Sequence, residues 1–185
     1  MTLPAQRHAT YEDLCQVPDH LIAQIIRGQL ITLPRPAPRH TRASASLGDE
    51  LVSPFDKGRG GPGGWWILDE PELHLGLDIL VPDLAGWRRE RMPVLPETAY
   101  FELAPDWLCE VLSPSTSRMD RVDKLPIYAR EGVGHIWLVD PDARTLEVMA
   151  LHEGHWLLLN AYKDDDEVCA APFDAIAFSL AALWP

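Results

Sequence analysis

The sequence predicts a mixed α/β or α+β fold in one domain. The chain has 185 residues, of which 46% are apolar and 24% are charged, the proportions of an ordinary globular protein with a substantial core. Apolar runs of strand length alternate with segments of helical periodicity. Neither an internal repeat nor a linker interrupts this pattern, so we expect one domain over residues 1–185.

Four stretches predict helices. Thr10 can cap the first, because Asp13 occupies its third helical position. The second keeps its apolar residues on one face. The third follows cap and turn residues at 113–117 and ends where Gly132 suits a helix C-terminus. The expected helices begin near residue 10 and cover residues 41–51, 118–131 and 178–183.

Runs of apolar and β-branched residues predict the strands. The first contains Arg27-Gly28, which indicates a hairpin or a bent strand, and the last two form a meander around an acidic turn. The expected strand ranges are residues 24–33, 65–75, 77–87, 106–112, 135–140, 145–151, 156–162 and 167–170. Residues 88–105 form a long connection with room for a short helix. Residues 57–64 are rich in glycine but lack the Gly-Lys-Ser/Thr of a phosphate-binding loop, so we expect a plain loop.

Charge and cysteine content narrow the function classes. A net charge of −12 repels phosphate, so a nucleic-acid partner would need a local basic groove, a basic partner protein or a metal ion. The three cysteines include no CxxC pair, which disfavours a disulfide framework and a structural zinc site. The sequence has neither the run of about 20 apolar residues that a membrane span needs nor a secretory leader. We therefore expect a cytoplasmic protein with no membrane partner.

Two carboxylates interrupt apolar faces in the middle of the chain. On a regular strand over residues 77–87, Asp83 shares its face only with apolar side chains. Glu110 likewise shares a face with Leu108 and Leu112. A lone acid of this kind more often lies near a strand end or pairs with Arg or Lys. Because buried carboxylates are costly unless they are paired or bound to metal, two together suggest a shared divalent cation, and their oxygens suit Mg²⁺ or Mn²⁺.

The predicted helix over residues 118–131 adds a polar stripe. Asp120, Lys124 and Tyr128 follow one another at i,i+4 spacing and directly succeed the strand that carries Glu110. Lys124 could therefore reach back toward the carboxylates, or it could simply pair with Asp120 on the surface. Pro126 should kink the helix or start a new turn near Leu125.

Several segments together carry a family resemblance: VPD (81–83), CEVLSPST (109–116), Asp120, Lys124, Tyr128, GV (132–133) and IWLVDP (136–141). In these segments the chain closely resembles the Uma family of restriction endonucleases, part of the PD-(D/E)XK nuclease superfamily. The resemblance spans about residues 10–150 and is most specific in EVLSPST. It implies a restriction-endonuclease-like core, a mixed sheet flanked by helices, with DNA as the substrate. It also implies that Asp83 and Glu110 correspond to the metal-binding acids.

If the site is active, we expect Asp83, Glu110 and the backbone carbonyl of Val111 to hold Mg²⁺ or Mn²⁺. The superfamily usually has a lysine two residues after the second acid, where this chain has Leu112, so Lys124 is the expected substitute.

Further residues are possible accessories to this site. Family members tend to have a glutamate where this chain has Gln24, a poorer metal ligand. His40, between Arg39 and Arg42, could contact phosphate or lie at a solvated helix end. Asp120 and Tyr128, from the polar stripe of the predicted helix, are the other accessory residues of the site.

Three functions remain open from the sequence. The first is a magnesium-dependent endonuclease that hydrolyses DNA, for which cutting both strands of a duplex would favour a homodimer. The second is a nuclease-fold binding or regulatory domain without turnover, suggested by Gln24, Leu112 and the net charge. The third is another two-carboxylate hydrolase, such as a glycosidase, which would work without metal.

Overall fold

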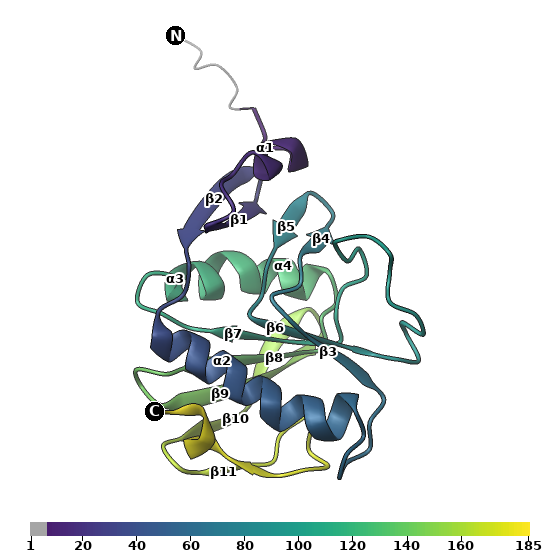
Figure 1. Cartoon of the computed structure of the whole chain (residues 1–185), viewed down its shortest axis with the longest axis vertical. Coiled ribbons are helices and arrows are strands. Elements are labelled where there is room, and N and C mark those ends of the chain that lie inside the picture. Colours follow the sequence, from purple (N-terminus) through teal and green to yellow (C-terminus); the bar gives the residue numbers. More distant parts are fainter. Residues whose placement is uncertain (1–6) are drawn as a thin grey trace.

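The computed structural model describes residues 7–185 and has the expected mixed α+β fold (Figure 1). Its centre is a six-stranded mixed sheet in the order β10-β9-β8-β7-β6-β3. Strands β7 and β8 are parallel, and the other neighbours are antiparallel. The strands are β3 (Trp65–Asp69), β6 (Leu84–Arg88), β7 (Trp107–Val111), β8 (His135–Asp140), β9 (Thr145–His152) and β10 (His155–Lys163).

A second, four-stranded sheet in the order β2-β1-β5-β4 stands at one end of the molecule (Figure 1). Its β1–β2 hairpin turns at Arg27-Gly28, where both residues have positive φ, +51° and +78°, as the tightest hairpin turns require. The strands are β1 (Leu21–Ile26), β2 (Gln29–Pro34), β4 (Leu73–Leu75) and β5 (Asp78–Leu80), and a separate pair joins β11 (Glu167–Val168) to β12 (Phe178–Ser179).

The helices begin where the sequence supplies caps and prolines. The Thr10 hydroxyl accepts the Asp13 N–H while the Asp13 carboxylate accepts the Thr10 N–H, a complete capping box. Helix α2 starts earlier than expected because Pro38 suits the first helical turn. The helical elements are α1 (Tyr11–Cys15), α2 (Pro38–Leu51), π-helical η1 (Val52–Asp56), α3 (Ser117–Met119), π-helical η2 (Asp120–Lys124), α4 (Leu125–Arg130) and 3₁₀ η3 (Leu180–Leu183).

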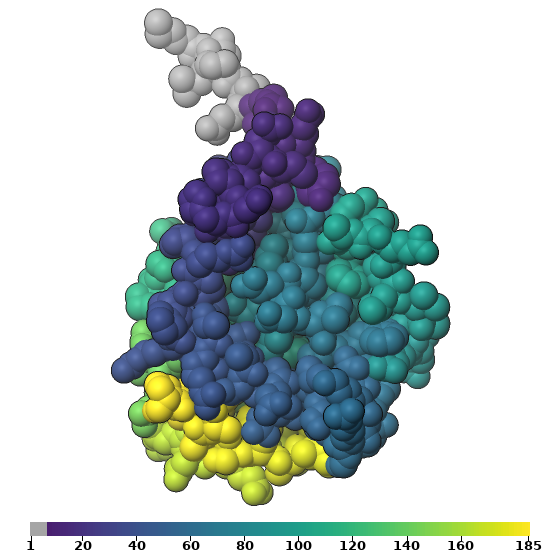
Figure 2. All heavy atoms as spheres, viewed as in Figure 1, coloured from purple at the N-terminus to yellow at the C-terminus, as the bar shows by residue number. Residues whose placement is uncertain are grey.

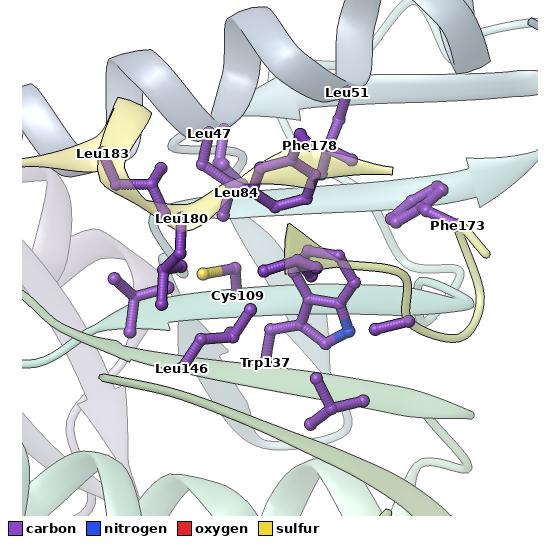
Figure 3. Close-up of a cluster of buried hydrophobic side chains, with 14 of the residues drawn as sticks. Leu47, Leu51, Leu84, Cys109, Trp137, Leu146, Phe173, Phe178, Leu180 and Leu183 are labelled. Atoms are coloured by element: carbon purple, nitrogen blue, oxygen red, sulfur yellow. The ribbon is translucent and has the colours of Figure 1, made fainter. Parts of the chain in front are cut away.

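The large sheet is buried on both faces. Helix α2 and the C-terminal segment cover one face, where Leu47 packs among Cys109, Trp137 and Leu180 (Figure 3). Helix α4 covers the other through Ile127 and Tyr128. Alternate residues of β7 therefore face opposite cores, and Glu110 points with Leu108 toward α4.

The two long strands predicted over residues 65–75 and 77–87 are wrong as single elements. Each divides between the two sheets, as β3 with β4 and as β5 with β6. Pro71 and Pro82 fall in the breaks, and proline cannot donate to a strand ladder. Asp83 consequently lies in a bend rather than on a regular strand, so the parity argument that singled it out rested on an incorrect local structure.

The division of these strands between two sheets also changes the expected burial of two residues. Leu77, placed on a buried face, is 83% exposed. Asp78, which an unbroken strand over residues 77–87 would place opposite to Asp83 and at the surface, is buried and accepts hydrogen bonds from the Arg27 N–H at 2.6 Å and the Arg130 guanidinium at 3.0 Å.

Two predicted helical segments differ from the structure. The predicted helix over residues 178–183 is a two-residue strand followed by a 3₁₀ turn, and residues 88–105 contain no helix. The segment predicted to lack a leader includes residues 1–6, which lie outside the described residues. In residues 7–185 no helix combines the length and the apolarity needed to cross a membrane.

Candidate active site

Glu110 is the centre of a buried ion-pair cluster on the α4 side of the sheet. Both of its carboxylate oxygens lie 3.1 Å from the Lys124 Nζ, and the Tyr128 hydroxyl donates to one of them at 2.6 Å. Only 3% of the Glu110 side chain is exposed. The carboxylate is thus fixed by three donor contacts in a nearly water-free setting.

Lys124 joins Glu110 to Asp120. Its ammonium lies 3.0 Å from Asp120 Oδ1, and both side chains are almost fully buried. An ammonium has three donors, and here all three meet carboxylate oxygens of Glu110 and Asp120. The i,i+4 pairing with Asp120 and the reach toward Glu110, which the sequence left as alternatives, therefore occur together.

The helical segment that carries these residues is irregular where Pro126 enters. Residues 117–130 run through α3, a π-helical turn and α4, and the Leu125 N–H donates to the Asp120 carbonyl five residues back. Because Pro126 has no N–H, it starts α4 in the first-turn position, as expected. The wider π turn still presents Asp120, Lys124 and Tyr128 to the sheet side.

Asp83 lies beside this cluster, in the bend between β5 and β6. The Val111 N–H donates to its Oδ2 at 2.7 Å, and His40 Nε2 lies 3.2 Å from its Oδ1. Its backbone carbonyl accepts the Glu70 N–H at 3.0 Å. Both carboxylate oxygens are therefore oriented, by β7 on one side and by α2 on the other.

The local charges shift the proton affinities of the site. Burial raises the pKa of Glu110 to about 8; the charges of Asp120 and Asp83 add to this rise, whereas Lys124 and the hydrogen bond from Tyr128 oppose it. Burial disfavours the charged form of Lys124, yet Glu110, Asp120 and Asp83 raise its pKa above the ordinary value. Burial and the Glu110 carboxylate raise the pKa of Tyr128. Glu110 and Asp120 thus share one lysine, and the charge of Asp83 acts on both Glu110 and Lys124.

The pKa of His40 is shifted by acids of the same site. Burial lowers its pKa, but the hydrogen bond and charge of Asp83 more than compensate, so that its pKa is raised overall. Its Nδ1 is buried, and no hydrogen-bond partner for it is found among the described residues.

A cavity of about 390 Å³ gives access to the cluster; we call it the acid cavity. Its lining includes Asp83, Glu110, Val111, Asp120 and Lys124, together with Gln24 and His40. The β1–β2 hairpin forms a wall, and Figure 2 shows this purple and dark-blue region standing over the teal segments. Of the eight residues predicted for the site, only Tyr128 is absent from this lining, because it lies behind Glu110.

Gln24 and Leu112, which stand where the family resemblance implies a glutamate and a lysine, make structural contacts instead. The Gln24 side-chain oxygen accepts the Val81 N–H at 3.0 Å, which ties β1 to the segment that leads to Asp83. Leu112 is buried in the core beneath α4. The lysine ammonium therefore reaches Glu110 from the helix instead of from the strand.

Sequence reasoning missed a second cavity, of about 470 Å³, on the other side of Asp83. It shares His40, Asp83 and Arg35 with the acid cavity and adds Asp69 and Glu70. Burial raises the pKa of both added carboxyls, with Asp83 contributing. The pair Asp69-Glu70 at the end of an apolar run was the available signal.

The donor set fits a hard divalent cation. Asp83 and Glu110 offer carboxylate oxygens, each with lone pairs beyond those already bonded, and their surroundings have excess negative charge. Within residues 7–185, no group of three or more His, Cys, Asp and Glu side chains forms a ready-made metal site. Two carboxylates completed by the Val111 carbonyl and water would match the sparse protein coordination that Mg²⁺ accepts.

Comparisons with known proteins agree with this fold. A family model for Uma2, described as "Putative restriction endonuclease", matches residues 8–181. Among solved structures, the chain is similar to a "putative nuclease belonging to DUF820" from Anabaena variabilis ATCC 29413. The TM-score is 0.75 at 22% identity, over 95% of this chain and 97% of that one. At that identity the likeness shows the fold alone. A search of curated proteins gave no match.

Proposed function

Because the chain belongs to the Uma2 restriction-endonuclease family, we propose that it is a metal-dependent endonuclease that hydrolyses phosphodiester bonds in DNA. The observation that carries the proposal is the meeting of Asp83, Glu110 and Lys124 in the lining of the acid cavity. Carboxylates and an ammonium in a recessed site are the groups that metal-assisted phosphate hydrolysis uses.

Asp83, Glu110 and the Val111 carbonyl would hold Mg²⁺ or Mn²⁺. Such an ion lowers the pKa of a bound water and polarises the scissile phosphate. Hydrolysis would join a water oxygen to phosphorus with loss of one proton, and would break the bond to the sugar oxygen, which takes up a proton.

The chain's own residues orient the acids. His40 and the Val111 N–H fix the two oxygens of Asp83, and Tyr128 fixes Glu110 from behind. Lys124 holds Glu110 and offsets part of its charge. For Lys124 to contact the attacking water or the phosphate, one of its three carboxylate contacts has to be exchanged.

Asp83→Asn is expected to reduce divalent-dependent DNA cleavage by more than about 100-fold, because loss of a ligand charge weakens metal binding at least as much as loss of an outer contact. The assay incubates the purified protein with circular DNA and Mg²⁺ or Mn²⁺, with and without chelator. Asp165→Asn, which removes the same charge from an exposed turn, should cleave like the wild type. Unchanged cleavage by Asp83→Asn, or cleavage that survives the chelator, would contradict the proposal.

A binding domain without turnover is the second candidate. It is favoured by the protein donors that already contact every carboxylate oxygen of Asp83 and Glu110, and by Gln24, whose side chain accepts a backbone N–H. This candidate predicts DNA binding but no cleavage with either metal, so the same assay separates the two functions.

A further inference from the structure

The acidic groups of the site are recessed in the lining of the acid cavity. The Glu110, Lys124 and Asp120 side chains are only 3–4% exposed, and that of Asp83 is 15% exposed. In an intact duplex the phosphates lie on the outer surface of a wide helix. A strand has to enter the cavity before one of its phosphates can reach these groups.

The dimensions of the acid cavity suit one nucleotide. Its volume of about 390 Å³ is near the small end of the range for small-molecule sites. The β1–β2 hairpin lines it with Ile22 and Leu33, and the turn after β7 adds Pro114. Apolar side chains of this kind contact bases that have left their stack.

Much of the positive charge around the cavity is already paired. Four arginines on the elements that frame it pair with acids: Arg27 with Asp123, Arg35 with Glu70, Arg39 with Asp142 and Arg121 with Glu147, at 2.9–3.7 Å. Arg42 and Arg118 make no ion pair with the described residues. A duplex presents one negative charge per about 1.7 Å and needs a matching row of cations. With a net charge of −12, this surface is poorly suited to a duplex and better suited to the lower charge density of a single strand.

We infer that the acid cavity accepts an unpaired DNA strand, one nucleotide at a time, and that an intact duplex is a poor substrate. This inference rests on the proposed nuclease function and specifies its substrate. It assigns Leu33 and the hairpin wall a role in admitting the strand.

The test compares a single-stranded DNA circle with a relaxed, covalently closed duplex of the same length, each with the wild-type protein and Mn²⁺ or Mg²⁺. We expect the single-stranded circle to be opened at least about tenfold faster. Equal or faster cutting of the duplex would overturn the inference and leave the proposed function standing. Cleavage of neither circle would overturn the proposed function, and the inference with it.

Binding gives a second readout that does not depend on turnover. The Asp83→Asn protein should bind a labelled single strand at least about tenfold more tightly than a blunt duplex in fluorescence anisotropy. Equal affinity, or preference for the duplex, would contradict the inference whatever the cleavage result.

A matched pair of variants tests the hairpin wall. Leu33→Trp adds bulk to the cavity lining without touching an ion pair, whereas Leu30→Trp adds the same bulk at an exposed position of the same strand. Provided both melt like the wild type, Leu33→Trp should lose at least about tenfold in single-strand affinity and Leu30→Trp should not change. Equal affinities of the two variants would overturn the role of the wall.

Discussion

Replacing Lys124 with methionine is expected to destabilise the protein by about 3–5 kcal/mol above about pH 8, where Glu110 is ionised, because two buried carboxylates then lose their shared counter-charge. Lys124 is the ammonium that lies within 3.1 Å of Glu110 and 3.0 Å of Asp120. The loss is a large part of the 5–15 kcal/mol that stabilises a typical domain. Denaturant unfolding monitored by tryptophan fluorescence measures it.

A control variant and a double variant show whether this loss comes from the ion-pair cluster. Lys163→Met, at an exposed position of β10, should change the unfolding free energy by less than about 0.5 kcal/mol. The double variant Lys124→Met/Glu110→Gln should regain part of the lost stability, because one of the two unpaired charges is removed. A neutral effect of Lys124→Met, or a double variant less stable than the single one, would contradict the ion-pair cluster.

Glu110→Gln is expected to abolish DNA cleavage while removing a loss of stability that the wild type shows as the pH rises. In the wild type, the pKa of Glu110 is raised to about 8 from an ordinary 4.5, so the unfolded chain loses this proton at lower pH than the folded protein does. The contribution of Glu110 to stability is therefore fully present below about pH 4.5 and is lost as the pH rises to about 8. Glutamine has no proton to lose, so the variant lacks this decline.

The measurement is the unfolding free energy of both proteins between pH 4.5 and pH 8. The variant should gain on the wild type as the pH rises, by about 1.4 kcal/mol for each tenfold difference in proton affinity between folded and unfolded Glu110. DNA cleavage by the variant should be lost at every pH if Glu110 is a metal ligand. Glu153→Gln, in an exposed turn, should show neither effect. A stability difference that stays constant with pH would rule out the raised pKa.

Local signals in the sequence predicted much of the fold. The Thr10 and Asp13 pair predicted the first helix and Arg27-Gly28 the hairpin turn, since each depends only on its neighbours. The continuous apolar run 77–87 could not reveal that its halves belong to different sheets, because strand partners are distant in the sequence. Pro82 was the one local indication of that break.

The location of the candidate site was predicted better than its environment. Polar residues set in apolar strands and i,i+4 spacing placed Glu110, Lys124 and Tyr128 together, and the structure shows them in contact. The links from Asp83 to His40 and to the Val111 N–H are tertiary, so no local pattern contains them. The cavity wall from the β1–β2 hairpin and the second cavity with Asp69 and Glu70 also depend on tertiary contacts, so the sequence could not reveal them. The catalytic and metal-binding roles of these residues remain predictions.

Diffraction from a crystal of the wild-type protein soaked with Mn²⁺ tests the central claim most directly. The account predicts an anomalous peak in the acid cavity, bonded to carboxylate oxygens of Asp83 and Glu110 at about 2.0–2.2 Å, and absent from an Asp83→Asn crystal treated in the same way. Saturating Mn²⁺ without a peak beside Asp83 and Glu110 would contradict it.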